Sequence, residues 1–189
     1  MILIFSYFIY MTLAAIGITS GYHRYFAHKE FKASVWQEVV MLYCGLLCGG
    51  RSVIGWVGVH RMHHAYADTE HDPHSPKYQP RWRVLFSTWK VDTIQRKYII
   101  DMMRNKRVMF FHKYGTYIFL AHQIIFFLLF GIDSLIVHSI VFALAYIGFG
   151  ILNLWGHNVD GPVNRVWINL IAPFEGNHSD HHTTDRNRT

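Results

Sequence analysis

The chain has 189 residues, enough for one domain, and it is 51% hydrophobic and 16% aromatic, which is rich for a soluble protein of this size. It is basic, with 18 Lys and Arg against 12 Asp and Glu, but these charges stand between long apolar runs. This placement indicates a membrane surface and not a nucleic acid as the partner.

The first predicted element is a membrane-spanning helix over residues 1–20. No charged side chain occurs from Met1 to Tyr22, and about 20 residues at about 1.5 Å each cross a hydrocarbon core of about 30 Å. The segment has no basic leader and no clear small-residue cleavage site, so we expect a span and not a cleaved signal peptide.

A shorter apolar run follows at residues 39–48 and ends in glycines and Arg51. It has about half the length of a span, which suits a re-entrant or interfacial helix better than a crossing. Its two cysteines, Cys44 and Cys48, are expected to be free thiols in a reduced core.

Two further spans are predicted over residues 114–132 and 134–155, with a tight turn between them around Asp133. All 18 Lys and Arg lie in residues 20–113 and 160–189. By the positive-inside bias, both stretches face the cytoplasm. The sequence therefore predicts an all-α, multi-pass integral membrane protein, with a stem of three spans and a cytosolic cap made by residues 21–113 and 156–189.

Histidine is the unusual residue of this chain, with 14 copies, most of them in three clusters beside the predicted spans. The clusters are His23 with His28, then His60, His63 and His64, and finally His178, His181 and His182. Positions i, i+3 and i+4 share one helix face, so each of the last two clusters is expected to point three imidazoles at one volume. His23 and His28 diverge by about 140° on an α-helix, which suits a helix end that opens around a metal.

His157, at the inner end of the last span, adds a ninth histidine. Neutral imidazole binds iron, zinc and copper. Nine are too many for one metal and suit two metals with an open position. They can build one site only on one side of the membrane, which again favours a re-entrant segment at residues 39–48. A membrane metal transporter or sensor stays open, although transport favours ligands at the midplane, where only His122 and His138 lie.

These motifs resemble the membrane fatty acyl desaturases of the stearoyl-CoA, delta-9 type. The resemblance rests on residues 17–24 with His28, residues 56–64 with Asp72-Pro73-His74, residues 153–157 and residues 175–182, which keep the family's order along nearly the whole chain. It implies one desaturase domain over residues 1–189, with a four-helix membrane stem and a cytosolic cap. The cap would hold two Fe²⁺ ions, which use dioxygen and two electrons to introduce a cis double bond into a long-chain acyl group.

The resemblance also assigns site residues. It implies nine histidines as metal ligands: His23, His28, His60, His63, His64, His157, His178, His181 and His182. It places Asn153 near one iron through a water, Met11 and Ala15 at the closed end of an acyl tunnel, and Trp56 at the tunnel's bend. His74 is expected to order the cap rather than to bind iron.

The acyl carrier stays open between coenzyme A, acyl carrier protein and a membrane lipid, so the substrate is a fatty acyl thioester or an acyl lipid. Animal members of the family carry an Arg-Asp pair that touches coenzyme A, and Gly58-Val59 stands there in this chain. The family usually has one more span ahead of the first histidine cluster, and this chain begins too late to contain it.

Electrons would come from a partner, ferredoxin or cytochrome b5 by analogy with the family, with the Lys and Arg residues between Arg81 and Lys113 as candidates for its docking. A related di-iron hydroxylase, which yields an alcohol, is the alternative enzyme.

Overall fold

The computed structural model describes residues 1–87, 91–158 and 160–186, and these residues are mainly helical. The elements are α1 (Ile2–Leu13), η1 (Ala14–Ala27), α2 (Val35–Leu47), α3 (Val53–Tyr66), α4 (Arg81–Leu85), η2 (Arg96–Tyr98), α5 (Ile100–Arg104), α6 (Lys106–Phe130), α7 (Ile132–Trp155), β1 (His157–Asn158), β2 (Gly161–Pro162), η3 (Val166–Leu170) and α8 (His178–Arg186). The two short strands pair antiparallel, with His157 opposite Pro162. The predicted all-α class is confirmed.

Among the described residues, three helices are long and apolar enough to cross a membrane: Ile2–Ala27, Lys106–Phe130 and Ile132–Trp155. The first two are longer than the predicted spans of residues 1–20 and 114–132. The first stays helical through the first histidine cluster. The second begins with Lys106 and Arg107, whose long side chains can keep their charges in water while the helix continues.

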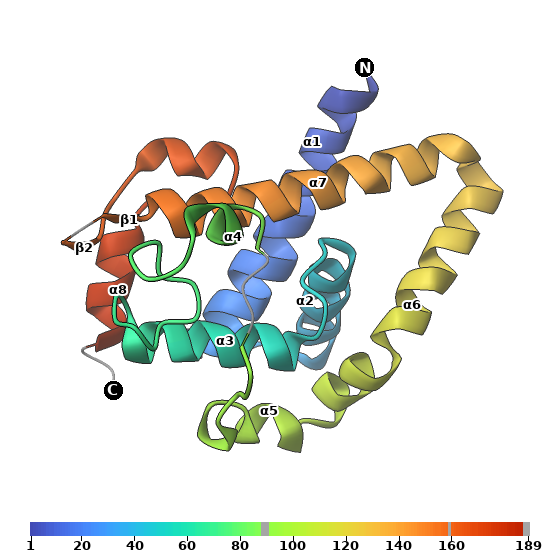
Figure 1. Cartoon of the computed structure of the whole chain (residues 1–189). Coiled ribbons are helices and arrows are strands. Elements are labelled where there is room, and N and C mark those ends of the chain that lie inside the picture. The colour runs from blue at the N-terminus through green and yellow to red at the C-terminus, as the bar shows by residue number, and fades with distance from the viewer. Residues whose placement is uncertain (88–90, 159, 187–189) are drawn as a thin grey trace.

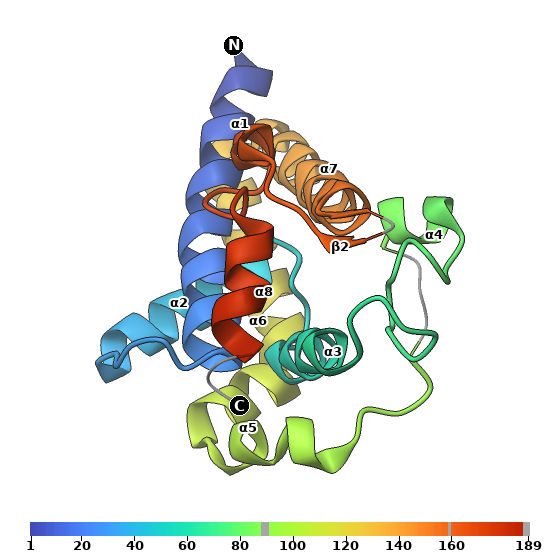
Figure 2. The ribbon, with the colours of Figure 1, turned by 90° about the vertical axis from the view of Figure 1, so that its left-hand side faces the viewer.

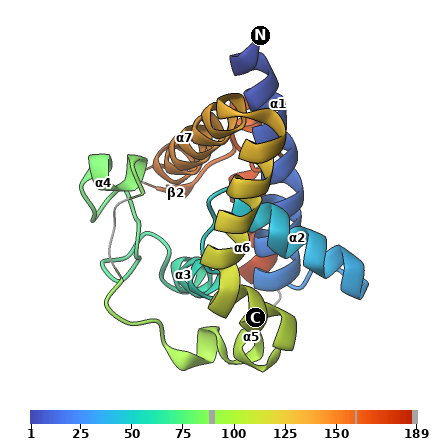
Figure 3. The same cartoon turned by 90° about the vertical axis from the view of Figure 1, so that its right-hand side faces the viewer.

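The turn between the last two spans is shorter than predicted. Helix α6 ends at Phe130 and α7 begins at Ile132, so Gly131, with a φ of 66°, makes the turn alone. Asp133 lies in the first turn of α7, where the helix dipole favours a negative charge. The two helices diverge from this turn instead of lying side by side (Figures 1 and 3).

The first span changes its helix type halfway. Residues Ala14–Ala27 form a π-helix, in which each N–H bonds to the carbonyl five residues back. One of these bonds, 3.0 Å long, joins the His28 N–H to the His23 carbonyl. The two imidazoles thus lie one turn apart, with ring centroids separated by 4.8 Å. The expected divergence of these side chains is wrong because it assumed an α-helical turn.

The core lies along the first span, where every fourth side chain is buried: Tyr10, Ala14, Ile18, Tyr22 and Phe26. This face packs against α2, α3 and α7. The approach of α2 is closest at two glycines, since a Cβ added to Gly17 would lie 2.1 Å from the backbone nitrogen of Gly45. The first span is therefore the central helix, with α7 against its first half and α2 and α3 against its second half (Figure 1).

Helix α2 packs along η1, and the chain then turns at Gly49 back to α3, which lies across the end of the first span (Figure 1). The Tyr43 hydroxyl of α2 is hydrogen-bonded to Nδ1 of His122 in α6, with an O–N distance of 2.7 Å. This return brings the histidines of α3 to the end of the first span that carries His23, as a re-entrant α2 would require. Both cysteines of α2 and its C-cap are free thiols.

Candidate metal centre

The nine histidines singled out in the sequence lie together at one end of the first span, in two groups. The five-histidine group consists of His23, His28, His60, His64 and His181. The four-histidine group consists of His63, His157, His178 and His182. Within each group, one ring nitrogen from every residue lies within 4.8 Å of the others, close enough to share a metal ion.

Each H-x-x-H-H cluster is divided between the two groups. In α3, His60 and His64 join the five-histidine group while His63 joins the other. In α8, His178 and His182 join the four-histidine group while His181 joins the five-histidine group. Residues four apart lie almost in line on a helix, and the residue between them points to one side. The expectation that each cluster serves one volume is therefore corrected.

Local capping fixes where these two helices begin. The Ser52 hydroxyl accepts a hydrogen bond from the Gly55 N–H at the start of α3. The Asn164 side-chain oxygen accepts one from the Ser179 N–H, 2.8 Å away, in the first turn of α8. Such caps satisfy free N–H groups of a first turn. They set the register in which the histidines face each other.

The Nε2 atoms converge in both groups. The Nε2–Nε2 distances are 2.9 Å from His23 to His181, 2.8 Å from His28 to His60 and 3.0 Å from His157 to His178. The buried Nε2 of His63 has no hydrogen-bond partner among the residues that the structure describes. Several lone pairs directed at one small volume suit a cation, so the donor set fits a metal in each group.

Burial keeps several of these imidazoles neutral. Desolvation lowers the pKa of His60, His63 and His178 well below its ordinary value, and neighbouring histidines lower it further. A neutral imidazole is the form that binds a metal. The electrostatics of the site therefore favour ligation over a cluster of charged side chains.

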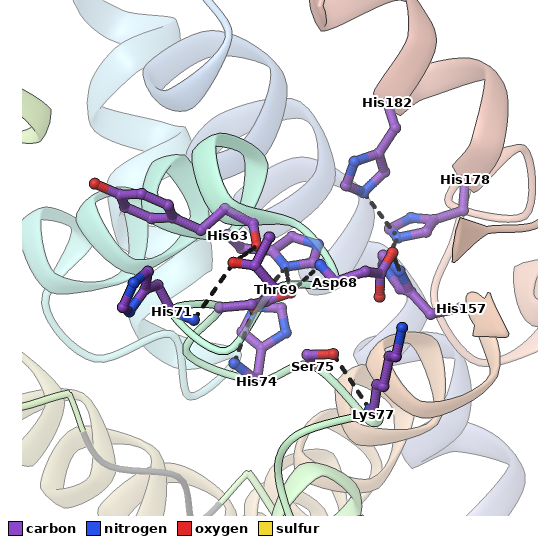
Figure 4. A network of polar contacts seen from close by, with 12 residues as sticks. His63, Asp68, Thr69, His71, His74, Ser75, Lys77, His157, His178 and His182 are labelled. Atoms are coloured by element: carbon purple, nitrogen blue, oxygen red, sulfur yellow. Dashed lines mark hydrogen bonds and ion pairs between the residues drawn. The ribbon is translucent and has the colours of Figure 1, made fainter. Parts of the chain in front are cut away.

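Three carboxylates hold the outer nitrogens of three of these histidines. The Nδ1–O distances are 2.8 Å from His23 to Glu175, 3.0 Å from His63 to Asp72 and 3.1 Å from His157 to Asp68. Figure 4 shows Asp68 beside His157. An N–H that donates to a carboxylate puts the ring proton on Nδ1 and leaves Nε2 free for a metal.

The sequence prediction assigned no role to these acids. Asp72 and Glu175 belong to the motifs that carry the family resemblance, and Asp68 stands outside them. The sequence feature that could have indicated their contacts is that Asp68 and Asp72 closely follow the second histidine cluster. Asp72 and Glu175 are buried, which is uncommon for acids without a partner.

His74 lies behind the four-histidine group. Its ring stacks on His63 with centroids 4.2 Å apart (Figure 4), and its backbone N–H donates to Asp72. Nitrogens of His63 and His74 and an oxygen of Asp72 also lie close enough to be a further candidate metal group.

A cavity of about 390 Å³ opens against both histidine groups. Its wall includes His23 and His60 of the five-histidine group and His63 and His178 of the other. The rest of the wall is mostly apolar, with a few polar side chains. These other lining residues are Ile18, Cys48, Gly49, Gly50, Arg51, Ser52, Gly55, Trp56, Val59, His74, Ser87, Ala145, Tyr146, Phe149, Leu152, Asn153 and Glu175. Size and lining suit an organic ligand with an apolar chain.

The cavity includes two of the four other predicted site residues. Trp56 lines it and stacks on His60, with ring centroids 5.0 Å apart. Asn153 lines it one helical turn before His157. Met11 and Ala15 are half-buried on the first span and are not among the lining residues; the first span contributes Ile18 and His23 instead.

The chain is similar to known proteins over nearly its whole length. The model of the fatty acid desaturase family matches residues 1–184. Delta-9 acyl-lipid desaturase 2 of Arabidopsis thaliana is 30% identical over 190 residues, which cover 93% of this chain and 62% of that protein. Delta-9 acyl-lipid desaturase 1 of the same plant is 30% identical over 186 residues, with 90% and 61% covered.

A third relative is more similar over a shorter stretch. The sn-1 stearoyl-lipid 9-desaturase of Synechocystis sp. is 42% identical over 69 residues, which cover 36% of this chain and 22% of that protein. The chain spans less than two thirds of the length of these relatives. Because the family match nevertheless includes all nine converging histidines, this chain belongs to the fatty acid desaturase family.

Proposed function

We propose that this chain desaturates a long-chain acyl group, with two iron ions held by the five-histidine and four-histidine groups. The observation that carries this proposal is the convergence of nine imidazoles into two groups. When bound, Fe²⁺ with dioxygen supplies the oxidising chemistry that unactivated C–H bonds require, since such bonds offer no handle to an acid or a base. The protein's own contribution is to place the acyl chain and exclude water.

The cavity is the proposed acyl site. Its apolar wall would bind methylene groups, and Trp56, held against His60, would fix the chain beside both histidine groups. The four-histidine group has one ligand fewer, which leaves room for a further ligand. We assign that place to a water held by Asn153, which reaches the cavity from the helix that leads to His157.

We favour a membrane lipid as the carrier of the acyl group. We also favour the delta-9 position for the double bond. Both Arabidopsis relatives are named delta-9 acyl-lipid desaturases. A Cβ at Gly58 would lie 2.6 Å from a methyl group of Ile94 and 2.7 Å from one of Ile99. A long basic side chain is therefore excluded at the position where animal relatives touch coenzyme A.

An external donor, ferredoxin or cytochrome b5, would supply the electrons on the cytoplasmic face. Four cations on α4 and η2 are exposed: Arg81, Arg83, Arg96 and Lys97. They would attract an acidic donor and steer its approach. Lys90, also among the predicted docking residues, lies outside the described residues.

The test of activity is expression in a host with a known lipid profile, followed by mass spectrometry of its fatty acids. Loss of two hydrogens from an acyl chain, with a new double bond, is expected. Gain of one oxygen would instead support the hydroxylase. An unchanged lipid profile in a host with a working donor, identical to that of His63→Ala, would reject both.

Iron content tests the two-metal centre separately. We expect about two irons per purified chain, one from each histidine group. His28→Ala and His182→Ala should each lower the content to about one, because they remove ligands of different groups. Full iron content in both variants would contradict the assignment. A transporter would place its ligands near the membrane midplane, whereas these nine histidines gather where the spans Ile2–Ala27 and Ile132–Trp155 end.

A further inference from the structure

The segment between β2 and α8 has an apolar face that the protein leaves open. Residues 166–174 carry no charged side chain. Four large apolar side chains of this segment are exposed: Val166 by 71%, Trp167 by 45%, Leu170 by 66% and Phe174 by 68%. On the opposite side, Ile168 and Ala172 are fully buried. A contiguous exposed apolar face of this kind marks a contact surface.

The segment runs along the first span, away from the metal centre at its Leu170 part and back toward it at Pro173. The Tyr7 hydroxyl donates to the Leu170 carbonyl at 2.8 Å, and the Thr19 hydroxyl donates to the Pro173 carbonyl at 2.8 Å. The Tyr10 hydroxyl donates to the carbonyl between them. Because Tyr7 precedes His23 by 16 residues, Leu170 lies on the order of 20 Å from the histidines along the helix.

Contact with helix α7 independently places the segment away from the metal end of that helix. A Cβ added to Gly148 would lie 2.5 Å from the Ile171 carbonyl oxygen, and Gly148 is about 10 Å before the end of α7 at Trp155. Nearby side chains of both spans, such as Phe8 and Ile147, are also exposed and apolar. Figure 2 shows the chain rising from β2 beside α1 and returning to α8.

The two ends of the segment meet on the side of the metal centre. The Arg165 N–H donates to the Gly176 carbonyl at 2.7 Å, and the Gly176 N–H donates to the Asn169 side chain at 2.8 Å. Inside the loop, the Ile168 carbonyl accepts from two backbone N–H groups. Internal partners for irregular backbone are what a lipid environment requires, since lipid offers none.

We propose that residues 166–174 form a re-entrant loop that enters the lipid leaflet on the metal side and returns to Glu175. Its partner is the lipid itself, because the exposed face is apolar, uncharged and continuous with the surface of two spans. Trp167 suits the boundary between lipid and water. The loop leads into Glu175, which holds His23, so its seat in the leaflet positions the third histidine cluster. Residues 166–174 thereby leave the aqueous cap in which they were expected.

The test measures immersion in the full chain reconstituted into phosphatidylcholine bilayers, and it does not depend on desaturase activity. Cys44 and Cys48 are replaced by Ala. A single cysteine is then introduced as Leu170→Cys or Phe174→Cys and labelled with a nitrobenzoxadiazole fluorophore. Both positions are exposed, so the label displaces no packed neighbour. Iron content equal to that of the cysteine-free parent shows that each variant is folded.

Two matched positions calibrate the result. Leu128→Cys on α6 is the lipid standard, since Leu128 is 76% exposed on a span, and Glu70→Cys in the cap is the aqueous standard. Nitroxides on the lipid acyl chains should quench the labels of Leu170→Cys and Phe174→Cys as strongly as the label of Leu128→Cys. Iodide should quench these two labels several times less than the label of Glu70→Cys. Quenching like that at 70 would place the loop in water. Quenching by neither agent would show that protein covers it. Either result overturns the proposal.

Discussion

Single side chains decide which nitrogen of a histidine can bind a metal. Glu175, Asp68 and Asp72 each accept the Nδ1–H of one histidine and so leave its Nε2 directed at the centre of its group. The sequence supplies enough histidines, but a histidine with the proton on the wrong nitrogen would not ligate. These acids therefore orient three of the histidines within the two groups.

Asp72→Asn tests this orientation. Asn keeps the shape but loses the charge that stabilises the His63 N–H contact, so iron affinity should fall about 10-fold to 100-fold. The measurement is competition for iron with a chelator of known affinity. Glu70→Gln is the matched control, an acid on the same loop whose side chain is 76% exposed. Equal affinities for both variants would refute the role.

Arg61, inside the second histidine cluster, ties that cluster to the first. Its guanidinium donates to the carbonyls of Phe26 and Ala27 at the end of η1 and to both carboxylate oxygens of Asp101. Arg61→Met should lower stability by about 2 kcal/mol, because it leaves these acceptors unpaired. Thermal unfolding of the detergent-solubilised protein measures this, with the exposed Arg104→Met as control. Equal midpoint temperatures of unfolding for the two variants would contradict a stabilising contact between Arg61 and the end of η1.

Asp101 gives the same contact a pH dependence. Burial raises the pKa of Asp101, but hydrogen bonds from Arg61 and Lys29 outweigh it and hold the pKa below its ordinary value. The stabilisation is thus present above about pH 4 and is lost as the pH falls through the lowered value. Asn does not titrate. The loss of stability at low pH that comes from Asp101 should therefore be absent in Asp101→Asn.

Ala15 carries the prediction about acyl chain length. If the first span closes the tunnel as the resemblance implies, Ala15→Trp should shorten the preferred chain. Gas chromatography of the unsaturated products measures this. Ala145, which lines the cavity from α7, provides a second test, because Ala145→Leu should shorten the chain by filling the cavity. Unchanged product lengths in Ala15→Trp would show that the first span does not form the closed end of the acyl tunnel.

At the level of helices, backbone geometry arranges the ligands. The π-helix over Ala14–Ala27 brings His23 and His28 onto one turn, and the α-helical spacing in α3 divides His60 and His64 from His63. A single helix can thus serve both groups, which fixes the distance between them. The close contact between η1 and α2 keeps this arrangement rigid.

Gly17→Ala tests that contact. Its Cβ would lie 2.1 Å from a backbone nitrogen of α2, which cannot move aside without shifting the helix. We expect a loss of several kcal/mol, or no folded protein, in thermal unfolding and size-exclusion chromatography. Gly115→Ala on α6 is the control, because its Cβ would meet only a side-chain methyl at 3.5 Å. It should be neutral or stabilising by up to about 1 kcal/mol. A stable Gly17→Ala would mean that the helices pack differently.

For the whole molecule, the metal centre is the point at which distant segments join. His23 and His181 are 158 residues apart and have their Nε2 atoms 2.9 Å from each other. Helix α8 is short and polar, so its histidines, rather than an apolar face, hold it against the bundle. Metal binding and the folding of this end of the protein should therefore be coupled.

Removal of iron by a chelator should loosen that end first. Backbone hydrogen exchange is expected to speed up in α8 and at the end of η1, while α6, which carries none of the nine histidines, should change little. Mass spectrometry of peptides from the protein with and without iron measures the difference. Uniform exchange in all helices, or no change in α8, would contradict the coupling.

The amino-acid sequence was sufficient for features that depend on residue type and local spacing. Charge-free runs predicted the three spans, the distribution of Lys and Arg predicted a basic cap, and the histidine clusters predicted a metal centre. Each follows from neighbours in the chain, because hydropathy and helical periodicity are local properties. The lengths of the spans were less predictable, since the first helix continues past the apolar run to Ala27.

Folding in three dimensions settled what depends on contacts between distant residues. It assigned His63 and His64, neighbours in the chain, to different groups, and it brought Asp68 to His157 across 89 positions. It also laid residues 166–174 along the first span, where the sequence predicted an aqueous cap. Periodicity within one helix cannot indicate which partner a side chain meets, because that depends on how the helices pack.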